Sequence, residues 1–134
     1  MARPKSEEPT NRELDILKVL WERGPSTIRE VQNDLNGKKS KKIAYNSVLT
    51  VLTIMHTKGF VDRDERSRSY VYSASYSRDE IENRLVQRMI RDVFGGSAMR
   101  LVARALPTRV ASEGEVEEIE RLLATMKGEV DGDP

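Results

Sequence analysis

Short polar side chains follow one face of the helix that the sequence predicts over residues 43–58. A rotation of about 100° per residue places on this face Asn46, Thr50, Thr53 and Thr57, with Ser47 at its edge. These residue types are mediocre helix formers because their side chains compete for backbone hydrogen bonds, and a solvated face would favour Glu, Lys and Gln. In the major groove of DNA, Asn can pair with adenine, and hydroxyl groups can contact bases or phosphates. The pattern predicts base-edge contacts from Asn46, Ser47 and Thr50, because N-terminal positions of such a helix usually reach the bases.

The opposite face of the same helix is apolar. Val48, Val51, Leu52 and Met55 lie within roughly 60° of one direction, with Ala44 beside them. These residues are expected to face a core, so that the polar face remains exposed.

Basic residues are concentrated around this helix. Residues 1–76 carry 14 basic and 10 acidic side chains, a net charge of +4, whereas residues 77–134 carry 9 and 12, a net charge of −3. Positive charge attracts a polyanion, and phosphate contacts position a protein on double-stranded DNA without specifying its sequence. We predict DNA backbone contacts from Lys41, Lys42, Tyr45, Thr53, Lys58, Arg66 and Arg68.

The elements around the helix have the order of a winged helix-turn-helix. A capping box at Thr10 and Glu13 predicts a helix that ends near Arg23, and Ser26-Thr27 predicts a second helix that ends at Asn36-Gly37. After the third helix and Gly59, two β-rich runs, 60–63 and 70–74, flank a charged segment. The expected fold is mainly α with a small β-hairpin, with the winged helix-turn-helix DNA-binding domain over residues 8–76.

Residues 77–127 predict further helices, which begin at a capping box at Ser77 and are interrupted by Gly95-Gly96 and Pro107. They contain too few apolar residues to bury one another, which indicates a helical dimerisation region; packing back on the N-terminal domain is the alternative. The predicted dimerisation residues are Ile81, Leu85, Met89, Val93, Val116, Ile119, Leu123 and Met126. Residues 1–7 and 128–134 are expected to be disordered tails.

The stretch from Arg12 to Tyr72 resembles the penicillinase-repressor family of bacterial winged-helix regulators, the BlaI/MecI/CopY type. The resemblance rests on the segments ELDIL (13–17), LW (20–21), TIREV (27–31), AYNSVLTVL (44–52) and KGFV (58–61). It extends to VFGGS (93–97), which is similar to the double-glycine break of the family's dimerisation region.

This resemblance implies a homodimer that binds an inverted-repeat operator and represses genes, often for β-lactam resistance, until a signal releases it. In well-known members a membrane sensor with metalloprotease activity triggers cleavage of an Asn-Phe bond in the dimerisation helices. That bond would fall near Ala103-Arg104, but the chain contains no Asn-Phe dipeptide. Ile54-Met55 also departs from the family's frequent Arg-Leu, and the absence of cysteine argues against the copper-responsive branch.

Other functional classes receive less support from the sequence. The only histidine, His56, has no obvious nucleophile beside it, and Asp62, Asp64 and Glu65 lack the ligand spacing of a calcium loop. We therefore predict no enzyme activity and no catalytic, cofactor or metal site. No apolar run approaches the roughly 20 residues that cross a bilayer, and the N-terminus lacks the apolar stretch of a secretory signal, so a cytoplasmic protein without membrane contact is expected. A winged helix used only for protein interaction, and a regulator released by a small ligand, remain alternatives.

Overall fold

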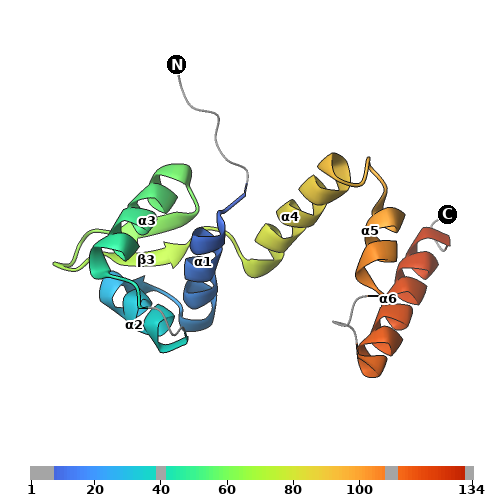
Figure 1. The fold of residues 1–134 in the computed structure, drawn as a ribbon, viewed down its shortest axis with the longest axis horizontal. Helices are drawn as coiled ribbons and strands as arrows, with labels where there is room; N and C mark the ends of the chain where they lie inside the picture. The colour runs from blue at the N-terminus through green and yellow to red at the C-terminus, as the bar shows by residue number, and fades with distance from the viewer. Residues whose placement is uncertain (1–7, 39–41, 108–111, 132–134) are drawn as a thin grey trace, which may run out of the picture. The chain divides into compact units, whose positions relative to one another are not determined.

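The computed structural model describes residues 8–38, 42–107 and 112–131 (Figure 1). The chain divides into two compact units, with the boundary after Gln87. The first unit contains the helices α1 to α3, a small sheet and the beginning of α4, whereas the second contains the end of α4 with α5 and α6.

Helix α1 (Asn11–Arg23) begins at the predicted capping box. The Glu13 amide donates to the Thr10 hydroxyl at 3.2 Å, and the Thr10 amide donates to Glu13 Oε1 at 2.8 Å. Two of the otherwise unpaired N–H groups at the helix start are thereby satisfied. The helix ends at Gly24, whose φ of 87° is a conformation that L side chains rarely adopt.

Helix α2 (Ile28–Lys38) begins at a second capping box, in which Thr27 and Glu30 exchange hydrogen bonds of 2.9 and 3.2 Å. The sequence predicted its end at Asn36-Gly37, but the helix continues to Lys38. Gly37 is accommodated within the last helical turn, and the Asn36 side chain bonds to the backbone of Ile43.

Three strands form an antiparallel sheet in the described part of the chain, in the order β1-β3-β2. The predicted hairpin is present as β2 (Val61–Asp64) and β3 (Val71–Ala74), with Val61 opposite Ala74. Strand β1 (Ser26–Thr27), which pairs with β3, was not expected, because two residues are too short to show an alternating pattern. With α3 between α2 and the hairpin in the chain, this is a winged helix-turn-helix. We call β2, β3 and the joining residues 65–70 the wing.

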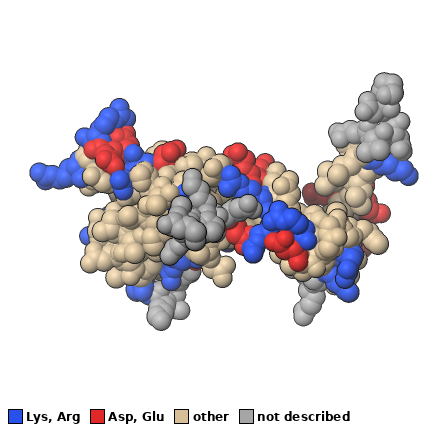
Figure 2. Space-filling view, turned by 90° about the horizontal axis from the view of Figure 1, so that it is seen from above, with Lys and Arg blue, Asp and Glu red and all other residues tan. Residues whose placement is uncertain are grey.

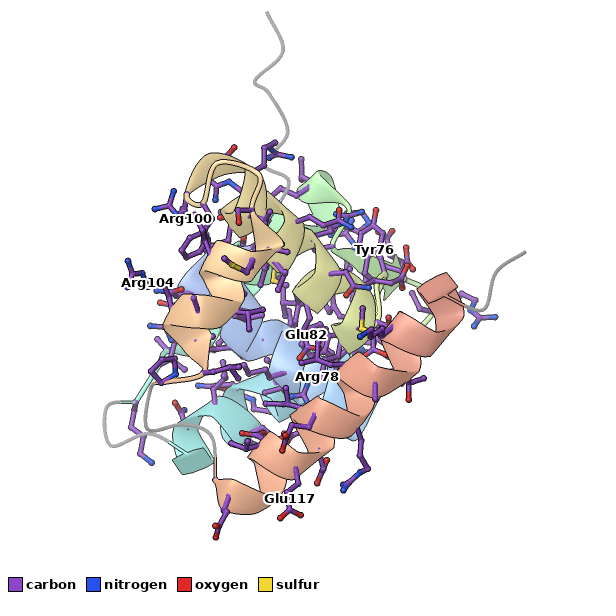
Figure 3. The ribbon with its side chains drawn as sticks, turned by 90° about the vertical axis from the view of Figure 1, so that its right-hand side faces the viewer. Tyr76, Arg78, Glu82, Arg100, Arg104 and Glu117 are labelled. Carbon is purple, nitrogen blue, oxygen red and sulfur yellow. The ribbon has the colours of Figure 1, made fainter. Side chains whose placement is uncertain are left out.

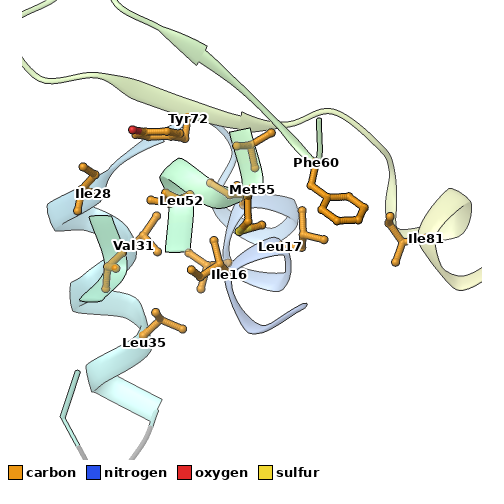
Figure 4. Packing of buried hydrophobic residues seen from close by; sticks show 14 residues of the cluster. Ile16, Leu17, Ile28, Val31, Leu35, Leu52, Met55, Phe60, Tyr72 and Ile81 are labelled. Atoms are coloured by element: carbon orange, nitrogen blue, oxygen red, sulfur yellow. The ribbon is translucent and has the colours of Figure 1, made fainter. Parts of the chain in front are cut away.

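Helix α3 (Tyr45–Lys58) is held by the core of the first unit (Figure 4). Val48, Leu52 and Met55 are fully buried as predicted, and Val51 packs against the core while remaining partly exposed. Ala44, expected beside these residues, is exposed, because it precedes the first helical turn and serves as the N-cap. Gly59 ends the helix in the left-handed conformation, with φ 86°.

The start of helix α4 (Arg78–Asp92) belongs to the first unit. Ile81 is 1% exposed and lies in the core, and Leu85 packs against the same core. The Trp21 indole N–H donates to the Tyr76 carbonyl at 2.9 Å, and the Arg78 guanidinium stands 5.6 Å from the Trp21 ring centre. The unit boundary therefore falls inside α4, eleven residues after the division predicted at residue 76.

The second unit is helical in its described residues. Gly95 and Gly96, both with positive φ, separate α4 from α5 (Ala98–Ala105). Arg100 and Arg104 project from the same side of α5 (Figure 3). Helix α6 (Glu113–Asp131) continues past Gly128, where the sequence predicted a disordered tail. Residues 1–7 and 132–134 of the predicted tails lie outside the described residues.

Candidate nucleic-acid interface

The polar face predicted for α3 is exposed. Asn46, Ser47 and Thr50 are all solvent-accessible on the first two turns, on the side opposite the buried Val48 and Leu52. The first turn contains no acidic residue, and the Ala44 N-cap supplies no side-chain hydrogen bond. The positive end of the helix dipole thus points outward beside Asn46 and Ser47, which favours an anionic partner.

The threonines of α3 share a hydrogen-bonding arrangement that the sequence pattern did not predict. The hydroxyls of Thr50, Thr53 and Thr57 donate to the carbonyls four residues earlier, at 2.9, 2.8 and 3.1 Å. Each hydroxyl proton therefore points back along the helix. The oxygen lone pairs and the methyl groups are left for an outside partner, such as an amino group or a thymine methyl.

The segment that enters α3 is clamped by two side chains of α2. Asn36 Oδ1 accepts from the Ile43 amide at 2.7 Å, and Asn36 Nδ2 donates to the Ile43 carbonyl at 3.2 Å. Gln32 Nε2 donates to the same carbonyl at 3.2 Å. Both backbone groups of Ile43 are thus satisfied two residues before α3 begins, which fixes the point from which Asn46 and Ser47 project.

The wing carries the second group of predicted contact residues, and Figure 2 shows basic and acidic side chains intermixed at that end of the first unit. Arg66 pairs with Asp64 at 2.7 Å, although its side chain is 90% exposed. The hydrogen bonds from Arg66 lower the pKa of Asp64 from 3.8 to about 2. Arg63 pairs with Glu65 at 2.6 Å, which raises the pKa of the guanidinium. Arg68, by contrast, takes part in no ion pair with any described residue.

Lys58 was predicted to contact the DNA backbone, and the structure gives it a role inside the fold. Its Nζ lies 3.0 Å from Glu13 Oε2 and 3.2 Å from Glu13 Oε1. The Glu13 carboxylate is 4% exposed, and a buried carboxylate needs a counter-charge. The ammonium group is therefore engaged with Glu13 inside the fold, and its contact with the DNA backbone stays a prediction.

The other predicted backbone contacts lie near the start of α3 or along it. Lys42 is exposed, and its Nζ donates to the Asn36 carbonyl at 3.0 Å. Tyr45 and Thr53 are exposed on α3, whereas Lys41 lies outside the described residues.

Arg29 is a residue that the sequence analysis missed. Its guanidinium stands 4.6 Å from the centre of the Tyr45 ring, which brings the first turn of α2 next to the first turn of α3. Arg29, Tyr45 and Arg68 line one pocket of about 210 Å³. The available signal was a basic residue in the first turn of the helix that precedes α3, because that turn approaches the DNA backbone in helix-turn-helix proteins.

Apolar side chains are exposed on each helix of the second unit. Of the predicted dimerisation residues, Val93 is 67% exposed, and about half of the surface of Met89, Leu123 and Met126 is accessible. Val116 is exposed and Ile119 is partly exposed. Ile81 is buried in the first unit's core and therefore does not belong to this surface, whereas Leu85 packs against that core and remains partly exposed. Exposed apolar residues that the prediction did not include are Met99, Val102, Leu106 and Leu122.

Two kinds of site receive no support from the described residues. No cluster of three His, Cys, Asp or Glu side chains is placed to hold a metal ion in residues 8–38, 42–107 and 112–131. In the same ranges, no helix combines the length and apolar character needed to cross a membrane.

Comparison with known proteins places this chain in a family. The penicillinase repressor from Staphylococcus aureus is 21% identical over 119 residues, covering 89% of this chain and 93% of that protein. The methicillin resistance regulatory protein MecI from Staphylococcus epidermidis is 20% identical over 119 residues, covering 89% and 95%. The solved structure of a MarR family protein from Bacillus stearothermophilus has a TM-score of 0.49 at 20% identity, covering 92% of this chain and 76% of that chain. The family model described as penicillinase repressor matches residues 9–125, so the chain belongs to the penicillinase repressor family.

Proposed function

We propose that this protein is a sequence-specific transcriptional repressor that binds a DNA operator through α3. The observation that carries the proposal is the exposed Asn46, Ser47 and Thr50 face on a helix whose opposite side, at Val48 and Leu52, is fully buried. The buried side fixes the helix on the domain, and short polar side chains allow close approach to base edges. The names of the staphylococcal relatives support control of β-lactam resistance or related stress genes.

The proposal includes a homodimer on an inverted-repeat operator. A two-fold symmetric dimer presents two copies of α3, and an inverted repeat presents two equivalent half-sites to them. The exposed apolar side chains of α5, α6 and the end of α4 support this part, because such residues are expected to bury against a partner.

Release from the operator by a signal completes the proposed function. Within the family such a signal can come from a sensor or protease that acts on the C-terminal region. The Ala103-Arg104 bond, near which the family's cleaved bond would fall, lies inside α5. Cleavage there would require local unfolding of this helix, because proteolysis requires an accessible, extended backbone.

Selection of bound fragments from the genomic DNA of the source organism tests the proposal directly. The purified full-length chain is mixed with sheared DNA, and retained fragments are sequenced. We expect enriched fragments to share one inverted repeat, with affinity for that repeat falling steeply as salt rises because bound phosphates release counterions. Enrichment no greater than that of a protein-free control would overturn the proposal and favour a protein-interaction module.

A further inference from the structure

The pocket beside the start of α3 is formed by three segments that are distant in the sequence. Its polar lining comes from Thr27 and Arg29 at the start of α2, Tyr45 at the start of α3, and Arg68, Ser69 and Tyr70 of the wing. The charged groups among the lining residues are the two arginines, and no carboxylate lines the pocket. The composition is suited to an anion with several acceptor oxygens.

Arg29 is held in position before any ligand arrives. Its guanidinium stacks against the Tyr45 ring at 4.6 Å, and Nη1 donates to Gln32 Oε1 at 2.9 Å. A guanidinium has five N–H donors in a planar fork. Because Arg29 makes one hydrogen bond with the described residues, donors remain available for a ligand.

The positive charge of the pocket is not compensated by its acidic neighbours. Arg63 and Arg66 of the wing are paired with Glu65 and Asp64, whereas Arg68 has no ion-pair partner among the described residues. On α2, Glu30 lies next to Arg29 in the chain, but its carboxylate caps Thr27 and pairs with Arg23 at 2.8 Å. The acidic groups near the pocket are therefore engaged elsewhere.

We propose that this pocket binds one phosphate group of the DNA backbone, which Arg29 and Arg68 hold jointly. The inference rests on the proposed function, since Tyr45 connects the pocket directly to Asn46 on the base-contacting face. A phosphate held between α2 and the wing would fix the wing relative to α3. It would also set the position of Asn46 along the groove, because a contact to the backbone determines register without reading sequence.

The salt dependence of binding to a short random-sequence duplex tests the joint contact. Arg29→Gln and Arg68→Gln should each weaken binding roughly ten-fold at low salt, as expected for lost charge-assisted hydrogen bonds. Each should also reduce the slope of log affinity against log salt concentration by about 1. If both arginines hold the same phosphate, the double variant should lose much less than the two single losses added together.

Matched variants separate this effect from a general loss of charge or fold. Lys18→Gln removes one positive charge from an exposed position of α1 and should leave the slope unchanged. Tyr45→Phe keeps the ring beneath Arg29 and should bind nearly as wild type, whereas Tyr45→Ala should resemble Arg29→Gln. Circular dichroism checks that each variant is folded.

The possible results distinguish the phosphate pocket, the joint contact and the proposed function from one another. If wild type binds DNA but both arginine variants match Lys18→Gln, the phosphate pocket is refuted while the proposed function stands. Fully additive losses would mean that two different phosphates are contacted, which refutes the joint contact. A wild-type protein with no affinity for DNA would overturn the proposed function itself, and the pocket inference with it.

Discussion

Lys58 Nζ lies 3.0 Å from Glu13 Oε2, so the last residue of α3 is joined to the first turn of α1. Lys58→Met should destabilise the protein by about 1–3 kcal/mol, because the buried Glu13 carboxylate loses its partner. Denaturant unfolding measures this change, and adding Glu13→Gln should recover much of it. If Lys58 acts only within the fold, the slope of log DNA affinity against log salt concentration should stay at the wild-type value. A decrease of about 1 would instead support the predicted phosphate contact.

The Asn36 clamp on Ile43 predicts a second effect on stability. Asn36→Ala removes two hydrogen bonds and should cost about 1–3 kcal/mol, since the Ile43 amide loses its partner and the Ile43 carbonyl keeps only Gln32. Hydrogen exchange at the Ile43 amide should accelerate. Exchange at the amides of α1 should accelerate only by the amount that the loss of global stability explains. Asn36→Asp keeps the acceptor and should preserve protection of that amide. Equal exchange rates in Asn36→Asp and Asn36→Ala would contradict the clamp.

Asn46 predicts a loss of selectivity. Asn46→Ala should relax the base preference at one position of each half-site at a cost of about 1–3 kcal/mol, because a bidentate contact to adenine would be lost. Competition binding with single-base variants of the selected operator measures this preference. Thr57→Ala, at the far end of the same face, is the control and should retain it. Unchanged selectivity in Asn46→Ala would remove this residue from the contact set.

The exposed apolar residues of α6 predict the oligomeric state. Leu123→Lys combined with Ile119→Lys should convert the proposed dimer to a monomer, because a charge cannot be buried in an apolar interface without a partner. Light scattering reports the mass, and operator affinity should fall with it. Glu117→Lys, a control on the same helix, should remain dimeric (Figure 3). A double variant that stays dimeric would show that α6 does not form the interface.

The Arg66–Asp64 pair predicts a pH response of the wing. The pKa of Asp64 falls from 3.8 to about 2 in the folded protein, so its contribution is fully present above 3.8 and is lost as pH drops through about 2. Carbon-13 NMR of the carboxyl group should show this low midpoint. In Arg66→Gln the midpoint should return toward 3.8, since the first cause of the shift is the side-chain hydrogen bond from Arg66. A midpoint near 3.8 in the wild type would show that the pair does not persist in solution.

The regular elements were predictable because their signals are local. Capping boxes at Thr10 and Ser77 marked helix starts, and the spacing of Val48, Leu52 and Met55 identified the buried side of α3. Hydrophobic periodicity reports which side of one element is buried. The periodicity therefore predicted the core face of α3, and the residues on the opposite side were predicted to be exposed.

The contacts between distant segments were not predictable from such signals. Lys58 is 45 residues from Glu13 in the chain, and nothing in the spacing of either helix indicates that they meet. Asn36 followed by Gly37 has the composition of a helix end, yet the tertiary contact with Ile43 determined its role. Ile81 has the helical spacing of a dimer residue, but the periodicity does not specify whether its partner surface is the same chain or another.

The hydroxyl bonds of Thr50, Thr53 and Thr57 have a consequence for the thermodynamics of binding. Long side chains such as Lys and Arg lose rotamer freedom when they are immobilised at an interface, at a cost of about 0.5–1.5 kcal/mol each. These threonines are short, β-branched and already tied to their own helix. The exposed face of α3 can therefore meet a partner with little conformational entropy left to lose, and shape complementarity rather than flexible adjustment would decide which sequences it accepts.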